Sequence, residues 1–182
     1  PRRQKMPPLY AYIGRLADQK GVDIILETIP RWLTKSDFMF VLLGNGDPCL
    51  EDKFRKMQTD FPNSVCCHID YNEPRAHLIE AASDFFLMPS RFEPCGLNQL
   101  YSMRYGTIPI VNDVGGLCDT VIDVVKNPRT GNGFKLVKHS PDGLMRTLRA
   151  SAKLYDNRVR LNRIRKRAMR TNFEWENSAK AY

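Results

Sequence analysis

Residues 90–106 read SRFEPCGLNQLYSMRYG, a stretch that joins a single carboxylate to a glycine and then to a segment with the composition of a helix. Glu93 lies just before Gly96, and the helix-like residues that follow end at Gly106. The segment DFFLMPS, which overlaps the start of this stretch, is apolar like a buried strand. A strand, a short loop and a helix in this order form the repeating unit of a parallel α/β sheet. The stretch therefore predicts such a unit, with Glu93 in its loop.

The same alternation of strand-like and helix-like segments runs through most of the chain. Apolar runs expected as strands are LYAYIG at 9–14, FMFVLLG at 38–44, SVCCHID at 64–70, DFFLMPS at 84–90 and TIPIV at 107–111. Segments expected as helices lie at 21–33, 49–61, 74–82, 97–106, 140–155, 157–169 and 174–182. Pro30 lies inside the first of these helices and predicts a kink or an early end. We therefore expect an α/β fold, a Rossmann-like parallel sheet with helices on both faces.

Length and composition favour a soluble globular protein of 182 residues, with 42% hydrophobic and 26% charged residues. Residues 1–8 are basic and proline-rich and are interpreted as a linker remnant, and residues 9–182 are interpreted as one domain. No apolar run approaches the roughly 18–20 residues that a membrane span needs. The five cysteines are odd in number and lack a C-x-x-C spacing, which argues against a disulfide framework or a zinc site and favours a reducing compartment.

The formal net charge of +8 is concentrated in residues 146–170, which contain ten Lys or Arg and one acid, Asp156. Apolar residues within this segment have helical spacing. The favoured interpretation is the solvated face of a helix, and the alternative is a surface for nucleic acid or another anionic partner. No aromatic residue lies between the basic residues at 158–170, which weakens the nucleic-acid alternative.

In a parallel sheet of this kind, ligands bind outside the carboxyl ends of the strands, so the loops after the strands are the candidate sites. The loop GRLADQKG at 14–21 carries Arg15 and Lys20 and enters a helix. Two cations and the free N–H groups of a helix start suit a phosphate group. The alternative for this loop alone is a pair of solvated surface charges.

Three other loops carry weaker patterns. GNGDP at 44–48 lacks the third glycine of a dinucleotide fingerprint and is interpreted as a plain turn. Tyr71 follows the third strand, where it either stacks on a nucleobase or packs against the protein. Gly115 and Gly116 permit a close backbone approach, or they form an ordinary turn.

Glu93 and the glycine after it suggest a ligand with two different parts. The N–H groups of Gly96, Leu97 and Asn98 would face an anion at the start of the helix. A carboxylate would repel that anion, but it would accept hydrogen bonds from a neutral hydroxylated ring. A sugar nucleotide combines both parts, and the two cations of the first loop would stabilise its departing diphosphate. The alternative is that Glu93 only caps the helix.

Taken together, these segments resemble the bacterial glycogen synthases and plant starch synthases, which are family 5 retaining glycosyltransferases of the GT-B type. The order and spacing of the matching segments are those of the C-terminal half of that family. The segments are GRLADQKG at 14–21, PSRFEPCGLNQLYSMRYGTIPIVNDVGGLCDTV at 89–121, GNGF at 131–134 and FEWENSAKAY at 173–182.

The resemblance implies a role for each matching residue. Arg15 and Lys20 match the pair that binds the distal phosphate and neutralises the leaving group. Glu93 matches the carboxylate that contacts the transferred glucose, and Tyr71 falls where the family stacks adenine.

The remaining implied donor-binding positions surround the start of the helix after Glu93. Cys95 and Gly96 match positions that line the glucose, and the amides of Leu97 and Asn98 match the phosphate-binding helix start. Two further residues, Gly115 and Gly116, match a loop near the donor.

The chain departs from the family pattern in two ways. Many related retaining transferases carry a second glutamate eight residues after the first, and here Tyr101 occupies that position. No segment matches the N-terminal half of the family, which supplies part of the donor site and most of the acceptor surface. We therefore interpret the chain as a donor-binding domain cut from a two-domain enzyme.

The function implied by the resemblance is transfer of glucose from ADP-glucose to the 4-hydroxyl at the non-reducing end of an α-1,4-glucan, with retention. No cofactor, metal, nucleic acid or membrane is expected to take part. The bacterial cytoplasm or a plastid is the expected location. The chain alone is expected to bind nucleotide without turnover, and the alternative function is a nucleotide-binding module that has no catalytic turnover.

Overall fold

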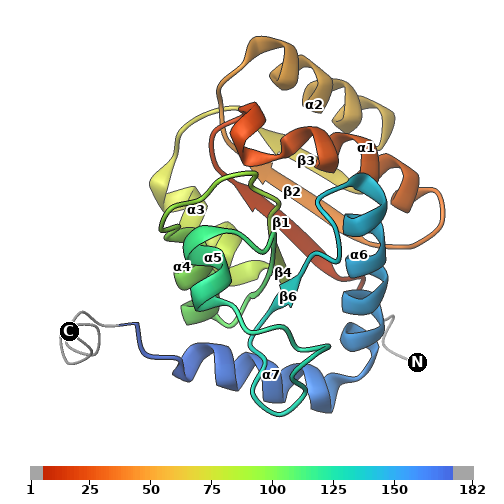
Figure 1. Cartoon of the computed structure of the whole chain (residues 1–182). Helices are drawn as coiled ribbons and strands as arrows, with labels where there is room; N and C mark the ends of the chain where they lie inside the picture. Colours follow the sequence, from red (N-terminus) through yellow and green to blue (C-terminus); the bar gives the residue numbers. More distant parts are fainter. Residues whose placement is uncertain (1–5, 174–182) are drawn as a thin grey trace.

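The computed structural model describes residues 6–173, and these form a six-stranded parallel sheet in the order β3-β2-β1-β4-β5-β6 (Figure 1). The strands are β1 (Leu9–Ile13), β2 (Met39–Leu43), β3 (Val65–His68), β4 (Phe85–Met88), β5 (Ile108–Val111) and β6 (Phe134–Lys135). The chain moves outward from β1 to β3 and then returns to place β4 beside β1, so the strand order reverses between β1 and β4. The expected Rossmann-like parallel sheet is confirmed.

Helices cover both faces of the sheet. They are α1 (Val22–Leu33), α2 (Pro48–Asp60), α3 (Glu73–Ala82), α4 (Asn98–Tyr105), α5 (Gly115–Thr120), α6 (Pro141–Asp156) and α7 (Arg158–Arg170), with a short 3₁₀ helix at Asp18–Lys20. Buried residues of α1, α2 and α6 belong to one core cluster, and those of α3, α4 and α5 belong to a second cluster. Helix α7 contributes to both clusters, through Leu161 and Ile164 to the first and Ala168 to the second.

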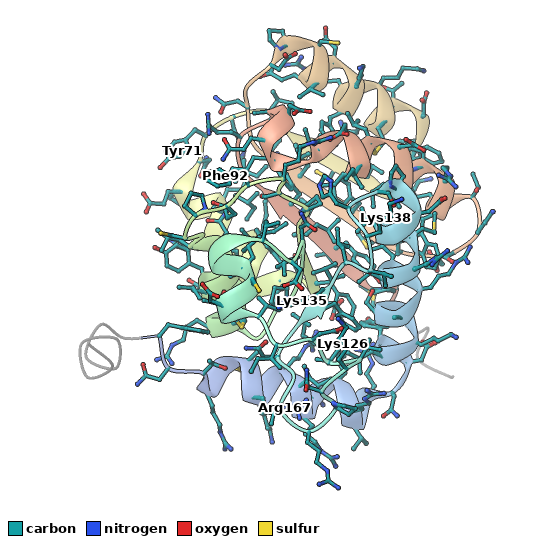
Figure 2. The ribbon with its side chains drawn as sticks, in the orientation of Figure 1. Tyr71, Phe92, Lys126, Lys135, Lys138 and Arg167 are labelled. Carbon is teal, nitrogen blue, oxygen red and sulfur yellow. The ribbon has the colours of Figure 1, made fainter. Side chains whose placement is uncertain are left out.

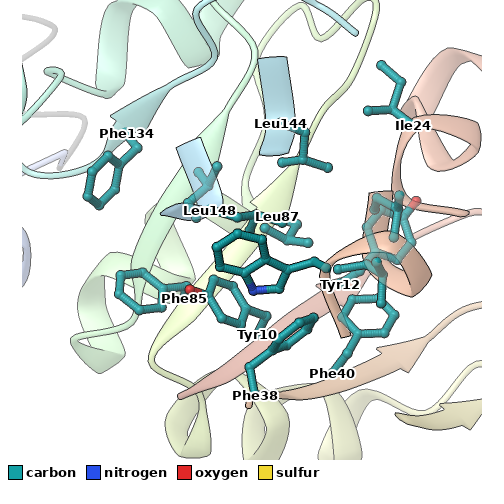
Figure 3. Packing of buried hydrophobic residues seen from close by; sticks show 14 of the residues in the cluster. Tyr10, Tyr12, Ile24, Phe38, Phe40, Phe85, Leu87, Phe134, Leu144 and Leu148 are labelled. Atoms are coloured by element: carbon teal, nitrogen blue, oxygen red, sulfur yellow. The ribbon is translucent and has the colours of Figure 1, made fainter. Parts of the chain in front are cut away.

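Alternate residues of the central strands enter opposite cores, as the two-residue period of a strand requires. Tyr10 and Phe85 lie in the first cluster, whereas Ala11 and Phe86 lie in the second. Figure 3 shows the first cluster, in which the Tyr10 ring stacks on Phe85 with centroids 5.0 Å apart. Tyr10 keeps a polar partner in this core because its hydroxyl hydrogen-bonds to Oγ of Ser151 at 2.9 Å. The burial of both faces explains why the strands are continuously apolar.

Two details differ from the expectation. Helix α1 does not end early at Pro30 but continues to Leu33, because proline lacks only its own N–H donor and its carbonyl still accepts the N–H of Thr34. The sequence did not predict β6, which has two residues and pairs with β5. The predicted helix at 174–182 lies outside the described residues.

The start of the first strand can be compared with the expected domain limits. Strand β1 begins at Leu9, where the domain was expected to start, and the hydroxyl of Tyr155 donates to the carbonyl of Met6 at 2.9 Å. The division at 1–8 and 9–182 stays a prediction.

Within residues 6–173, no helix combines the length and apolar character that crossing a bilayer requires.

The basic segment forms the end of α6 and all of α7, with Leu161, Ile164 and Ala168 buried beneath the charged face. Part of the charge is used inside the fold. Arg165 pairs with Asp84, and Arg167 donates to the carbonyl of Pro128 at 3.0 Å. The arrangement agrees with the favoured interpretation of an amphipathic helix with a charged outer face.

The stacked pair at the centre of the first core predicts a stability effect. Phe85 is fully buried, so Phe85→Ala should lower the free energy of unfolding by about 3–5 kcal/mol through lost burial and a residual cavity. The measurement is urea unfolding followed by circular dichroism. The matched control is Phe92→Ala, because Phe92 is 62% exposed and its truncation should change the free energy by less than about 0.5 kcal/mol. Equal losses from both variants would contradict this description of the core.

Candidate active site

The strand order brings the loops after β1 and β4 together at the carboxyl edge of the sheet. Such a reversal in strand order opens a crevice, because the following helices, α1 and α4, pack on opposite faces. Two cavities occupy this edge, one of about 290 Å³ and one of about 70 Å³. Both are lined by Ile13, Gly14 and Asn98, so they adjoin each other where β1 ends and α4 begins.

The smaller cavity contains an ion pair between Lys20 and Glu93. Nζ of Lys20 lies 2.6 Å from Oε2 of Glu93, and the hydroxyl of Ser90 donates to the same oxygen at 3.1 Å. The side chains of Lys20 and Glu93 are 21% and 10% exposed, so both charges are largely removed from water. A charge in such a place must be paired to be tolerated.

Close backbone contact between two loops makes this pair possible. Gly21 has φ of 66° and ends the 3₁₀ helix that carries Lys20. A Cβ at Gly21 would lie 1.9 Å from the carbonyl oxygen of Pro89, so glycine is required by both conformation and space. His139 Nε2 donates to the same carbonyl oxygen at 2.8 Å. The start of the Glu93 loop is therefore fixed against the Lys20 loop.

Arg91 also binds the Glu93 loop to the Lys20 loop, on the side that faces solvent. Its backbone N–H donates to the carbonyl of Gln19 at 2.8 Å, and its guanidinium donates two hydrogen bonds to Asp23 at 2.8 and 2.7 Å. The hydrogen bond from Arg91 lowers the pKa of Asp23. Bidentate pairs of this kind combine strength with fixed geometry, so Arg91 orients the loop rather than the ligand.

Gly115 and Gly116 pack against the backbone of the Glu93 loop and line neither cavity. The N–H of Gly116 donates to the carbonyl of Glu93 at 3.0 Å. A Cβ on Gly116 would lie 2.1 Å from the carbonyl oxygen of Cys95, and one on Gly115 would lie 2.1 Å from that of Glu93. In this structure the close approach that the glycines permit is made to the protein backbone. Their contact with the donor stays a prediction.

The start of α4 carries free backbone donors. Gly96 has φ of 69°, and no side chain caps the helix at Leu97. Within residues 6–173, the N–H groups of Gly96, Leu97 and Asn98 have no hydrogen-bond acceptor. The alternative that Glu93 only caps this helix is wrong, because its carboxylate accepts from Lys20 and Ser90 instead. An anion beside α4 would meet several unpaired donors.

The larger cavity has an aromatic ring at its lip. Tyr71 lies between β3 and α3 and is 84% exposed, so the alternative that it packs into the protein is wrong (Figure 2). Arg15 lines this cavity, whereas Lys20 lines the smaller one. The hydroxyl of Tyr12 donates to the carbonyl of Arg15 at 2.7 Å, and the side-chain amide of Asn98 donates to Ile13 at 2.9 Å. Arg15 and Lys20, the two residues expected to bind phosphate, therefore lie on either side of the boundary between the cavities.

The remaining residues predicted to bind the donor differ in whether they line a cavity. Gly96, Leu97 and Asn98 line the smaller cavity, but Cys95 does not line it and is exposed. The turn at 44–48 is more than a turn, because Gly44 and Asn45 line the larger cavity.

Sequence reasoning missed a group of residues that line the larger cavity. Asn45, Asp70 and Asn72 follow strands, so the rule for carboxyl ends of strands contained the signal for them. His77, Glu80 and Tyr101 lie on α3 and α4, and only the packing of these helices brings them to the cavity.

The structure describes no candidate for a metal centre in this region. Within residues 6–173, no three side chains of His, Cys, Asp or Glu form a potential metal site. The five cysteines are all free thiols, and four of them are exposed.

The comparisons with known proteins agree with this geometry. Two glycogen synthases, from Thermosipho melanesiensis and Alkalilimnicola ehrlichii, are each 46% identical to the chain, over 176 and 179 residues. These matches cover 96% and 98% of this chain but 36% and 37% of the two relatives. The catalytic domain of starch synthase IV from Arabidopsis thaliana, bound to ADP and acarbose, superposes with a TM-score of 0.89 at 36% identity. That match covers 100% of this chain and 38% of the other.

The chain thus spans little more than a third of the length of the relatives it matches. The resemblance to glycogen and starch synthases is confirmed, and the fold is that of one half of a GT-B glycosyltransferase. The family described as "Glycosyl transferases group 1" matches residues 1–170. The chain therefore belongs to the group 1 glycosyl transferases, a family of enzymes.

Proposed function

We propose that the chain is the donor-binding domain of a glycogen or starch synthase that transfers glucose from ADP-glucose to the non-reducing end of an α-1,4-glucan, with retention. One observation carries the proposal: two cavities of different chemistry adjoin at the free amides of α4. The starch synthase IV structure holds ADP, which supports a nucleoside diphosphate as the ligand of this chain.

The two cavities divide the donor into its parts. Adenine stacks on Tyr71 at the lip of the larger cavity, where an exposed aromatic ring offers a face. The diphosphate lies at the start of α4, between Arg15 on one side and Lys20 on the other. Glucose enters the smaller cavity, where the carboxylate of Glu93 accepts hydrogen bonds from its hydroxyl groups.

The same arrangement favours departure of the diphosphate and attack of the acceptor on one face of the sugar. The bond between C1 and the phosphate oxygen breaks, and its electron pair goes to the diphosphate, which Lys20 and the α4 amides stabilise. The acceptor hydroxyl forms the new bond to C1 and gives its proton to a diphosphate oxygen. Glu93 is the sole carboxylate lining the smaller cavity within the described residues, and its negative charge stabilises positive character at C1.

A second candidate function is nucleotide binding without turnover by this chain alone. The chain spans 36–38% of the relatives, and the proposed acceptor surface belongs to the other half of the enzyme. The two candidates differ in a simple observable, since an enzyme produces ADP from ADP-glucose in a glucan-dependent way, and a binding module produces none.

For the chain alone we expect ADP binding without glucan synthesis. Isothermal titration calorimetry should give a dissociation constant on the order of 0.1–1 mM, equivalent to about 4–5.5 kcal/mol. Incubation with ADP-glucose and glycogen should release no ADP above the background without glycogen. Robust release from the chain alone would show that the other half is dispensable and would contradict this expectation.

Lys20→Ala in the full-length enzyme should lower kcat/KM by about 10²–10³, by analogy with the loss of one donor to a developing oxyanion. The reason is that the leaving diphosphate loses its nearest cation on the sugar side. Steady-state rates of ADP release measure the effect. The control is Lys56→Ala, because Lys56 lies on α2 and pairs with Asp60. An unchanged rate for Lys20→Ala would show that Lys20 does not stabilise the leaving group.

Glu93→Gln and Glu93→Ala in the full-length enzyme should both lower kcat, the alanine variant by about 10²–10³ and the glutamine variant by less, because glutamine keeps one acceptor oxygen. ADP affinity should stay the same or rise, since Nζ of Lys20 loses its carboxylate partner and becomes free for phosphate. Melting temperature, ADP affinity and turnover are measured on the same samples. Glu27→Gln, an exposed change on α1, is the control. A fully active Glu93→Ala enzyme would rule out the sugar contact.

A further inference from the structure

A histidine and a buried glutamate form part of the α3 wall of the larger cavity. Nδ1 of His77 lies 3.4 Å from Oε2 of Glu80, and the two side chains are 45% and 3% exposed. Within the described chain, Oε2 of Glu80 accepts no hydrogen bond of good geometry. Burial raises the pKa of Glu80, and the hydrogen-bonding influence of His77 opposes that rise. A buried carboxylate with no partner would be costly, so its place beside an imidazole calls for an explanation.

The imidazole of His77 lies beside Glu80 of its own helix and two aromatic rings of α4. The ring lies edge-on to Tyr101, with centroids 6.4 Å apart and planes at 71°. Its other neighbour is Tyr105, with centroids 6.0 Å apart. Glu80 occupies the Nδ1 side, which leaves Nε2 as the ring nitrogen available to a ligand in the cavity. A buried carboxylate beside one imidazole nitrogen is the usual means of fixing the other nitrogen for contact.

The position of His77 indicates which part of the bound nucleotide it would contact. Tyr71 lies at the lip of the cavity, and Asn98 lies at its junction with the smaller cavity. In the proposed complex, the sugar that links base to diphosphate lies between them, in the part of the cavity where residues of α3 and α4 form one wall. A ribose hydroxyl both donates and accepts, so it can pair with Nε2 whether or not that nitrogen carries a proton.

We propose that His77 hydrogen-bonds a ribose hydroxyl of the bound nucleotide and that Glu80 is the residue that positions it. The inference rests on the proposed function, because it takes a nucleoside diphosphate as the ligand. It assigns ribose recognition to α3, a helix that carries none of the residues expected from the sequence to bind the donor.

The test is calorimetric titration of the 182-residue chain with ADP, 2′-deoxy-ADP, 3′-deoxy-ADP and inorganic diphosphate. The variants are His77→Ala, His77→Asn, His77→Gln and Glu80→Gln. The amide nitrogen of glutamine takes the place of Nε2 and that of asparagine takes the place of Nδ1, so only glutamine should restore the contact. His68→Ala is the matched control, because His68 lies on β3 and does not line the cavity. Melting temperatures confirm that each variant is folded.

The expected result is a roughly tenfold loss of ADP affinity in His77→Ala and His77→Asn, a smaller loss in His77→Gln and Glu80→Gln, and no loss in His68→Ala. One of the deoxy nucleotides should bind the wild-type chain about tenfold more weakly than ADP, and His77→Ala should not weaken it further. Diphosphate affinity should be equal in all variants, because the proposed contact of His77 is with the ribose and inorganic diphosphate has none.

Two results would overturn the inference while leaving the proposed function intact. One is ADP affinity in His77→Ala equal to that of the wild-type chain. The other is an equal loss for ADP and both deoxy nucleotides, which would mean that His77 only supports the cavity wall. A wild-type chain that binds diphosphate but shows no preference for ADP would overturn the proposed function together with the inference.

Discussion

The ion pair between Lys20 and Glu93 spans 73 residues of sequence and 2.6 Å of space, and the geometry of the site depends on it. The two loops meet because β1 and β4 are neighbours in the sheet, at the point where the strand order reverses. Both charges are largely buried, so each requires the other. Two backbone contacts, the close approach of Gly21 to Pro89 and the hydrogen bond from Arg91 N–H to the carbonyl of Gln19, hold the two loops together beside the pair, and the N–H of Gly116 fixes the Glu93 loop to the start of α5.

The sequence predicted the strands well because a strand covered on both faces is a continuous apolar run, as in FMFVLLG and DFFLMPS. It missed β6 because two paired residues are too few to show any period. The early end expected at Pro30 does not occur, because proline removes only its own hydrogen bond to the preceding turn, and α1 continues for three more residues. In each case the error arose where a short element or an element end is decided by its tertiary neighbours.

The site was predictable in part. Loop positions and residue types identified Glu93, Lys20 and Tyr71, because the carboxyl ends of parallel strands share one edge. The contact between Lys20 and Glu93 was not predictable, since it requires the order of the strands. His77 and Glu80 lie three residues apart on one predicted helix, so their contact follows from the helix itself, and only their position at the cavity requires the packing of α3. Gly115 and Gly116 illustrate the limit of a glycine pattern: it indicates a close approach but not what approaches, and here the neighbour is the backbone of the Glu93 loop.

A carboxylate beside an anion site looks unfavourable until the lysine is considered. In this structure, Lys20 neutralises Glu93, and Ser90 supplies a second donor to the same oxygen. Under the proposed function, a diphosphate at the start of α4 would compete with Glu93 for the ammonium group of Lys20, because both are anions within reach of one cation. In the proposed complex, a diphosphate that draws Lys20 away leaves the negative charge of Glu93 uncompensated toward the sugar, with Ser90 as its remaining donor. The proposed function would thereby link binding of the leaving group to stabilisation of positive character at the reacting carbon through the side chain of Lys20.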